Sequence, residues 1–268
     1  MAGPQCCAHP PTLNPSSGAG HVEKFGGLDS YVSGSPDSKL AILLVSDVYG
    51  YEAPNLRGGY TLRGVLRKEA FRFVVISLFR MVILWKLADK IAAAGFYAVV
   101  PDFFYGDPFA RDNAERPIQV WLKDHGPHKG FEDAKRVIEA LNSKGVSAIG
   151  AVGFCWGAKV VVELGKSSAF IKAAVLCHPS FVTVDDFKEF KVPISILGAE
   201  IDQMSPPALL KQFEEVLASK SEVDSFVKIF PKVAHGWTVR YDVEDEAAVK
   251  SAEEAHGNLM EWFAKYVK

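Results

Sequence analysis

Short, continuous apolar runs alternate along this chain with segments in which apolar residues recur at helical spacing. Runs of this kind are typical of strands that are buried on both faces of a parallel sheet. The pattern therefore predicts an α/β fold, with a mostly parallel central sheet and helices on both of its faces. We expect strands at residues 31–33, 40–46, 96–100, 148–154, 173–177, 193–198 and 226–230. We expect helices at 131–144, 158–164, 206–219 and 244–268.

The predicted elements follow one another without a linker or an internal repeat. Residues 1–22 contain Pro, Gly and Ser but no periodic apolar pattern, so we expect an irregular tail there. This tail has neither the basic nor the apolar region of a secretory signal. Residues 23–268 are expected to form a single domain, which is an ordinary size for an α/β fold.

Residues 58–85 do not fit this pattern. From Phe71 to Trp85 every residue is apolar except two arginines and one serine. If Arg57 were joined directly to Lys86, one amphipathic helix would run to the stop at Gly95. One hypothesis is that the insert is an accident of gene structure, such as a translated retained intron. The alternative is a lid or a membrane-touching helix, since the apolar part is short for a membrane span of about 20 residues.

Composition and charge narrow the possible classes of function. The chain of 268 residues is 49% apolar and 23% charged, which is typical of a soluble globular protein. Its net charge of −2 does not indicate the basic surface that a nucleic-acid-binding protein needs. The four cysteines form no disulfide framework, which favours a reducing, cytoplasmic location. Cys6 and Cys7 lie near His9, but a metal site needs more ligands, so we expect no metal.

The strongest chemical motif is residues 153–157, Gly-Phe-Cys-Trp-Gly. It follows a predicted buried strand and precedes a predicted helix. In the Gly-x-Ser-x-Gly motif of α/β-hydrolases, the same context places a nucleophile on a strained turn between strand and helix. Here Cys155 takes the place of the serine. The alternative is an inert buried thiol, which is common for free cysteine.

A cysteine nucleophile needs a base and an acid that orients the base, and both follow along the chain. Asp202 lies after the strand predicted at 193–198, and His235 lies five residues after the strand predicted at 226–230. Nucleophile, acid and histidine occur in this order in α/β-hydrolases. Glu200 is the second candidate for the acid. Alternatively, Asp202 caps the helix that begins near Pro206, and His235 is an ordinary loop histidine.

These motifs resemble the dienelactone hydrolase family. The resemblance rests on residues 153–157, on Asp202 in Ala-Glu-Ile-Asp, and on His235-Gly-Trp. It extends to residues 46–57 and to Pro-Asp-Phe-Phe at 101–104, and is closest to the plant branch. In total it covers about residues 20–57 and 86–268, and residues 58–85 have no counterpart. The motifs are specific for the family and say little about the substrate.

The resemblance implies hydrolysis of a carboxylic ester or lactone through a thioester acyl-enzyme, without a cofactor. Cys155 would attack, His235 would transfer protons, and Asp202 would orient His235. The backbone N–H groups of Val48 and Trp156 would form the oxyanion hole. The resemblance also implies Asp47 beside the resting thiol, in place of the Glu of the bacterial enzymes, and Arg240 at a substrate carboxylate. Trp121, His125 and His128 lie where a lid loop could face the pocket, and Trp121 is the candidate among them for substrate binding. Arg240 could also be a solvated surface residue.

Two other functions remain open at this stage. One is a ligand-binding or inactive protein on the same fold, with the insert disturbing the segment that carries Asp47 and Val48. The other is a β-glucan hydrolase, because plant members of the family are sometimes labelled glucanases. Glycoside hydrolysis normally needs two carboxylates at the bond, and Asp202 would be committed to His235. The expected partner is a small-molecule ester or lactone. The oligomeric state stays open.

Overall fold

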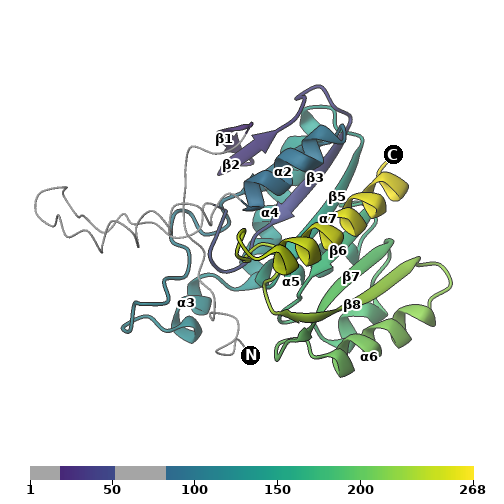
Figure 1. Ribbon diagram of the computed structural model, residues 1–268. Helices are drawn as coiled ribbons and strands as arrows, with labels where there is room; N and C mark the ends of the chain where they lie inside the picture. Colours follow the sequence, from purple (N-terminus) through teal and green to yellow (C-terminus); the bar gives the residue numbers. More distant parts are fainter. Residues whose placement is uncertain (1–18, 52–82) are drawn as a thin grey trace, which may run out of the picture.

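A computed structural model describes residues 19–51 and 83–268, and these residues form an eight-stranded sheet (Figure 1). The strand order is β1-β2-β4-β3-β5-β6-β7-β8. The strands are β1 (His21–Phe25), β2 (Leu28–Ser33), β3 (Leu40–Val45), β4 (Tyr97–Pro101), β5 (Ala148–Phe154), β6 (Ala173–Cys177), β7 (Ile194–Ile201) and β8 (Ser225–Ala234).

The sheet is parallel from β4 through β3, β5, β6 and β7 to β8. Only β1 and β2, at one edge, run antiparallel to their neighbours. Strands β3, β5 and β6 are almost completely buried, which explains why their sequences are continuous apolar runs. The mostly parallel α/β fold predicted from the sequence is therefore confirmed.

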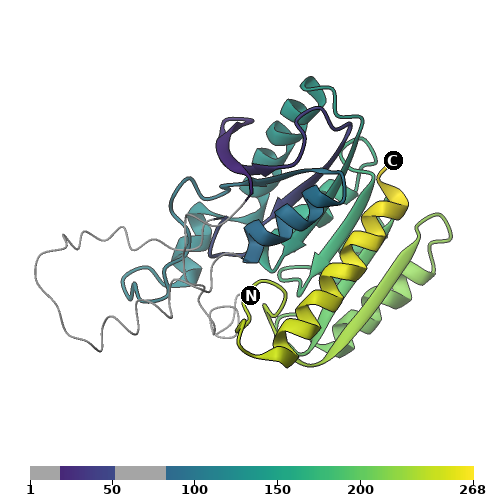
Figure 2. The same cartoon turned by 45° about the horizontal axis from the view of Figure 1, so that its top comes forward.

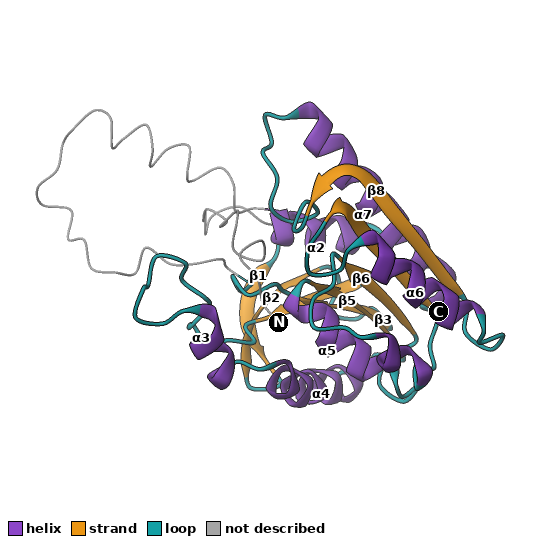
Figure 3. Ribbon diagram, turned by 90° about the horizontal axis from the view of Figure 1, so that it is seen from below, coloured by secondary structure: helices purple, strands orange, loops and turns teal. Residues whose placement is uncertain are grey.

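Helices cover both faces of the sheet (Figure 3). Alternate residues of β3 show the two layers, since Leu43 packs into one apolar core and Ile42 into the other. The Leu43 side holds α4 (Pro127–Ser143), α5 (Trp156–Gly165) and α6 (Pro207–Ala218). The Ile42 side holds α2 (Ile83–Ala93) and α7 (Glu246–Tyr266), which both lie in front of the sheet in Figure 2. A short helix, α3 (Ile118–Asp124), and a 3-10 turn, η2 (Val184–Lys188), complete these elements.

Several strands differ from the prediction: β1 is not among the predicted strands, β2 begins at Leu28, β7 ends at Ile201, and β8 is longer than expected. β1 begins at His21, so the last two residues of the predicted tail belong to the sheet. β8 continues past Pro231 to Ala234, and His235 follows it directly instead of lying five residues beyond the strand. Pro231 does not end β8 because β8 is an edge strand, where a missing N–H is tolerated. A register irregularity between Ala199 and Ile201 of β7 accompanies this extension.

Helix α2 begins inside the insert that the sequence analysis singled out. Ile83, Leu84 and Trp85 form its first turn, so the helix includes the last three residues of the insert. The hypothesis that a chain without residues 58–85 forms one continuous helix stays a prediction. The Trp85 ring stacks on Tyr31 at a centroid distance of 4.4 Å and is buried. Trp85 thus fills the position that Arg57 would hold in the spliced sequence. Residues 58–82, and most of the tail at 1–22, lie outside the described residues.

Within residues 19–51 and 83–268, no helix is long and apolar enough to cross a membrane. The cytoplasmic location expected from the cysteine content stays a prediction.

Candidate active site

Cys155 lies on a sharp turn between β5 and α5, with φ of 51° and ψ of −108°. A residue other than glycine is strained when its backbone φ is positive, and such residues concentrate at functional sites. The flanking glycines make the turn possible. A Cβ on Gly153 would lie 2.3 Å from the Gly157 carbonyl oxygen, and a Cβ on Gly157 would lie 2.2 Å from the Val45 carbonyl oxygen. The Gly-x-Cys-x-Gly spacing is therefore required by backbone contact.

His235 and Asp202 form a buried pair at the carboxyl ends of β8 and β7. His235 Nδ1 lies 2.8 Å from Asp202 Oδ2, and both side chains are fully buried. The other carboxylate oxygen, Oδ1, accepts hydrogen bonds from the backbone N–H groups of Met204 and Ser205. These contacts fix the carboxylate and direct Nε2 of His235 away from it. The N-cap of α6 is Pro206, so Asp202 does not cap that helix. Glu200, the second candidate for the acid, accepts a hydrogen bond from the Lys232 N–H.

The charge balance around His235 favours its protonated form. Burial acts to lower the pKa of His235, but the adjacent Cys155 thiolate and the Asp202 carboxylate outweigh it and raise the pKa to about 9. At neutral pH the arrangement thus favours an imidazolium beside a thiolate. An imidazolium in this position favours the thiolate form of the Cys155 side chain.

Asp47 and Arg240 form a second buried ion pair, between Asp47 Oδ2 and Arg240 Nη1. The Tyr49 N–H donates to Asp47 Oδ1 at 2.9 Å, and the Arg240 guanidinium lies 5.3 Å from the centre of the Tyr49 ring. Burial raises the pKa of Asp47, Arg240 opposes that rise, and the Cys155 charge adds to it. Arg240 is therefore a buried neighbour of the site and not a solvated surface residue.

Val48 and Trp156, the two residues expected to supply oxyanion-hole N–H groups, lie after β3 and at the start of α5. Val48 follows β3 and is fully buried, and its carbonyl oxygen accepts the Phe109 N–H. Trp156 follows Cys155 directly and is the first residue of α5. Its indole Nε1 donates to the His125 carbonyl oxygen at 2.9 Å.

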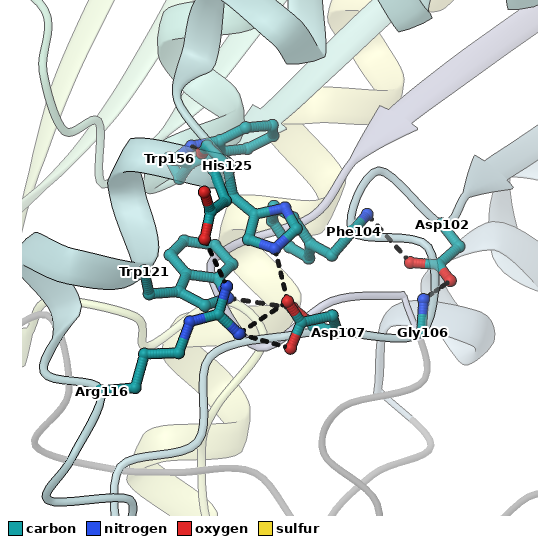
Figure 4. Close-up of polar contacts among 9 residues, drawn as sticks. Asp102, Phe104, Gly106, Asp107, Arg116, Trp121, His125 and Trp156 are labelled. Atoms are coloured by element: carbon teal, nitrogen blue, oxygen red, sulfur yellow. Dashed lines mark hydrogen bonds and ion pairs between the residues drawn. The ribbon is translucent and has the colours of Figure 1, made fainter.

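Trp121 and His125 belong to a polar and aromatic network beside Trp156 (Figure 4). Asp107 accepts hydrogen bonds from both Nη1 of Arg116 and, at 2.7 Å, from the ring of His125. The Trp121 indole donates to the Asp107 carbonyl oxygen, and the Trp121 ring is buried. His128 lies exposed on the first turn of α4. The structure thus brings Trp121 and His125 to Trp156, whereas His128 faces solvent.

Comparison with known proteins gives the family. The model of the "Dienelactone hydrolase family" matches residues 82–267, more than half of the chain. The chain belongs to the dienelactone hydrolase family. A maize protein named "Endo-1,3;1,4-beta-D-glucanase" is 42% identical over 199 residues, which are 74% of this chain but 54% of the maize protein. A Xenopus tropicalis "Carboxymethylenebutenolidase homolog" is 29% identical over 245 residues, covering 90% of this chain and 88% of that protein.

Solved structures carry the same fold. The dienelactone hydrolase from Anabaena variabilis superposes with a TM-score of 0.58 at 11% identity, covering 94% of this chain and 99% of that structure. At this identity the likeness extends to the fold alone. Among the residues that this structure describes, no group of three or more His, Cys, Asp or Glu side chains is arranged to hold a metal ion.

Two histidines that the sequence analysis missed contact the turn after His235 in this member of the dienelactone hydrolase family. His178, directly after β6, makes a 2.8 Å hydrogen bond from Nε2 to the Thr238 hydroxyl. His256 of α7 donates from Nε2 to the Thr238 carbonyl oxygen at 2.9 Å. The His178 ring also packs edge-on against His235, with centroids 5.0 Å apart. The two histidines thereby position the segment that carries His235 and Arg240.

Both of these histidines are buried in the neutral form. Burial, together with the charges of His235 and Arg240, lowers the pKa of His178 well below its usual range. Burial also lowers the pKa of His256 to about 4. A lone histidine with no motif around it gives no sequence signal for such a role. The one sequence feature that could have pointed to His178 is its position in His-Pro-Ser, directly after the apolar run of β6.

The pKa of His256 predicts a pH-dependent stability. The unfolded chain takes up a proton near pH 6.5, whereas folded His256 takes one up only near pH 4. Between these values the unfolded state binds more protons, so folding stability falls as the pH is lowered. We expect His256 to account for a loss of about 3 kcal/mol between pH 7 and pH 4. Urea unfolding across this range should show a flatter profile for His256→Gln than for the parent, while the exposed His128→Gln follows the parent.

Proposed function

We propose that this chain hydrolyses a carboxylic ester or lactone, with Cys155 as nucleophile, His235 as general base and acid, and Asp202 as the group that orients His235. The observation that carries this proposal is the position of Cys155 on a strained strand-to-helix turn beside the buried His235–Asp202 pair. Membership of the dienelactone hydrolase family supports a hydrolase of the ester or lactone type.

In the acylation step, the Cys155 thiolate attacks the carbonyl carbon and a C–S bond forms. The N–H groups of Val48 and Trp156 would stabilise the tetrahedral oxyanion. Collapse of this intermediate breaks the C–O bond of the ester, and protonated His235 gives its proton to the leaving alkoxide. In a lactone the alkoxide stays tethered to the acyl group. The product of this step is a thioester on Cys155.

In the deacylation step, neutral His235 takes a proton from water as the water oxygen attacks the thioester carbon. The C–S bond then breaks, the acid is released, and Cys155 returns to the thiolate beside the His235 imidazolium. The Asp202 carboxylate stabilises that imidazolium through its contact with Nδ1. Each group therefore ends the cycle in its starting state.

Arg240 and Asp47 set the charge that the substrate meets. Arg240 is proposed to bind a carboxylate of the substrate, and Asp47 to contact the resting thiol. Because the two side chains pair with each other, an anionic substrate group has to compete with Asp47 for the guanidinium. Trp121 is proposed to form part of the wall of the binding site, through the network that reaches Trp156.

The carboxylates of the site support ester hydrolysis over glycoside hydrolysis. A glycosidase needs two carboxyl groups that flank the scissile bond, one of them free to donate a proton. Here Asp202 is bound to His235 and Asp47 is bound to Arg240. The name of the maize relative therefore does not lead us to propose a glucanase.

The test is hydrolysis of p-nitrophenyl acetate and of a small lactone by the full chain. We expect turnover that Cys155→Ala abolishes and that Cys177→Ala, which removes another buried thiol, preserves. Turnover that survives in Cys155→Ala would contradict the assignment of the nucleophile. If the parent binds esters, as shown by a thermal shift, but does not hydrolyse them, the chain is a binding protein on this fold.

A further inference from the structure

We propose that Ser180 is a catalytic residue whose hydroxyl donates a hydrogen bond to the Cys155 sulfur, stabilising the resting thiolate and its departure during deacylation. The proposal rests on the function assigned to Cys155 above. Its basis is a buried contact of 3.3 Å between Ser180 Oγ and Cys155 Sγ. Both residues are fully buried.

Backbone contacts from two sides fix the place of Ser180. Its N–H donates to the Cys155 carbonyl oxygen at 3.0 Å, which ties Ser180 to the nucleophile turn. The preceding Pro179 carbonyl oxygen accepts the Ser205 hydroxyl at 2.9 Å. The Ser205 N–H in turn donates to Asp202, the orienting acid. The Ser180 hydroxyl is therefore held against the sulfur by the same segments that hold the triad.

The charges around the sulfur decide which atom donates. His235 lies beside the sulfur with a proton that it retains at neutral pH, and Asp202 supports that charge. The Asp47 charge disfavours the thiolate and is itself balanced by Arg240. His178, next to His235, is neutral. With sulfur in the thiolate form, the serine hydroxyl is the donor, and a hydrogen bond to an ionised acceptor is stronger than one to a neutral acceptor.

The hydroxyl affects the two half-reactions differently. A thioester sulfur carries no charge and accepts hydrogen bonds weakly, so the contact weakens when the acyl-enzyme forms. When water attacks the thioester, the C–S bond breaks and negative charge returns to the sulfur. The water proton goes to His235, and the Ser180 proton stays on Oγ throughout. Ser180 therefore lowers the barrier to deacylation, whereas in acylation it stabilises the thiolate reactant and does not lower the barrier.

The first experiment measures the thiolate without substrate, by its far-ultraviolet absorbance as a function of pH, with Cys155→Ala as the blank. Ser180→Ala should move the midpoint of thiolate formation to higher pH, with an ionisation constant about tenfold smaller. Ser195→Ala is the matched control, because Ser195 is a fully buried strand serine whose hydroxyl bonds to no other described residue. Its midpoint should equal that of the parent. A Ser180→Ala midpoint equal to that of the parent would overturn the proposal.

The second experiment uses p-nitrophenyl acetate. Slower deacylation in Ser180→Ala should lower kcat and KM together by about tenfold, leave kcat/KM nearly unchanged, and enlarge the burst of p-nitrophenol. Ser180→Thr, which keeps the hydroxyl, should restore both parameters. A rise in KM at constant kcat would contradict the role in deacylation. If Ser180→Ala does not fold, Ser180→Cys, with a weaker donor, replaces it in both experiments and should show the same shifts. If the parent shows no turnover, the proposed function fails, whereas the absorbance experiment still decides the role of Ser180.

Discussion

Replacing His235 with alanine is expected to lower kcat/KM for an aryl ester by about 10⁴-fold, because in the proposed mechanism His235 both stabilises the thiolate and transfers protons in each half-reaction. Its pKa of about 9 in the resting site comes from the Cys155 thiolate and Asp202. Without the imidazolium, the buried sulfur takes up a proton and loses its nucleophilicity. Steady-state kinetics at neutral pH, together with thiolate absorbance, measure both effects.

Two further variants make this prediction specific. Asp202→Asn should lower kcat by about 10²-fold to 10⁴-fold with little change in KM, since it removes the group that orients His235 and stabilises its charge. The exposed His128→Ala should behave as the parent does. A His235→Ala enzyme within tenfold of the parent would show that another group performs the proton transfers.

Replacing Arg240 with methionine is expected to destabilise the protein by about 3–5 kcal/mol at neutral pH, because the buried Asp47 carboxylate loses its paired cation. Burial already raises the pKa of Asp47, and Arg240 limits that rise. In the variant, Asp47 is protonated in the folded state up to a higher pH. The folded state then binds more protons than the unfolded state, so the loss of stability grows as the pH rises.

Urea unfolding at acidic and neutral pH tests this prediction. The double variant Asp47→Asn with Arg240→Met should recover much of the stability, since no unpaired charge stays buried. The exposed Arg111 is the matched control, and Arg111→Met should leave the free energy of unfolding nearly unchanged. Equal stability of Arg240→Met and the parent would show that the ion pair is not buried in solution.

The sequence predicted the sheet well because buried parallel strands carry a local signal. The apolar runs at β3, β5 and β6 each need apolar side chains on both faces, and turns punctuate them. The strand β1 gave no such signal, because most of its residues are exposed at the edge of the sheet. The end of β8 was misplaced because Pro231 signals a break that an edge strand tolerates.

In the candidate site, too, residues marked by a local motif were predictable, and residues joined only by tertiary contacts were not. Cys155 was predictable because two glycines mark its turn within a few residues. The partner of Arg240 was not, since Asp47 lies 193 residues away along the chain. The contacts of Ser180 and Thr238 join residues that are far apart along the chain and that the arrangement of β5, β6 and β8 brings together. The place of Trp85 in α2 was not predictable either, because its stacking on Tyr31 is likewise a tertiary contact.

The measurement that tests the central claim most directly is the detection of the acyl-enzyme. The full chain is mixed with p-nitrophenyl acetate, quenched with acid within one turnover, digested and analysed by mass spectrometry. We predict an acetyl group on the peptide that contains Cys155, released by hydroxylamine as a thioester is, and lost at the rate of kcat. Turnover of the ester with no acyl group on Cys155, at any time before the steady state, would contradict the account.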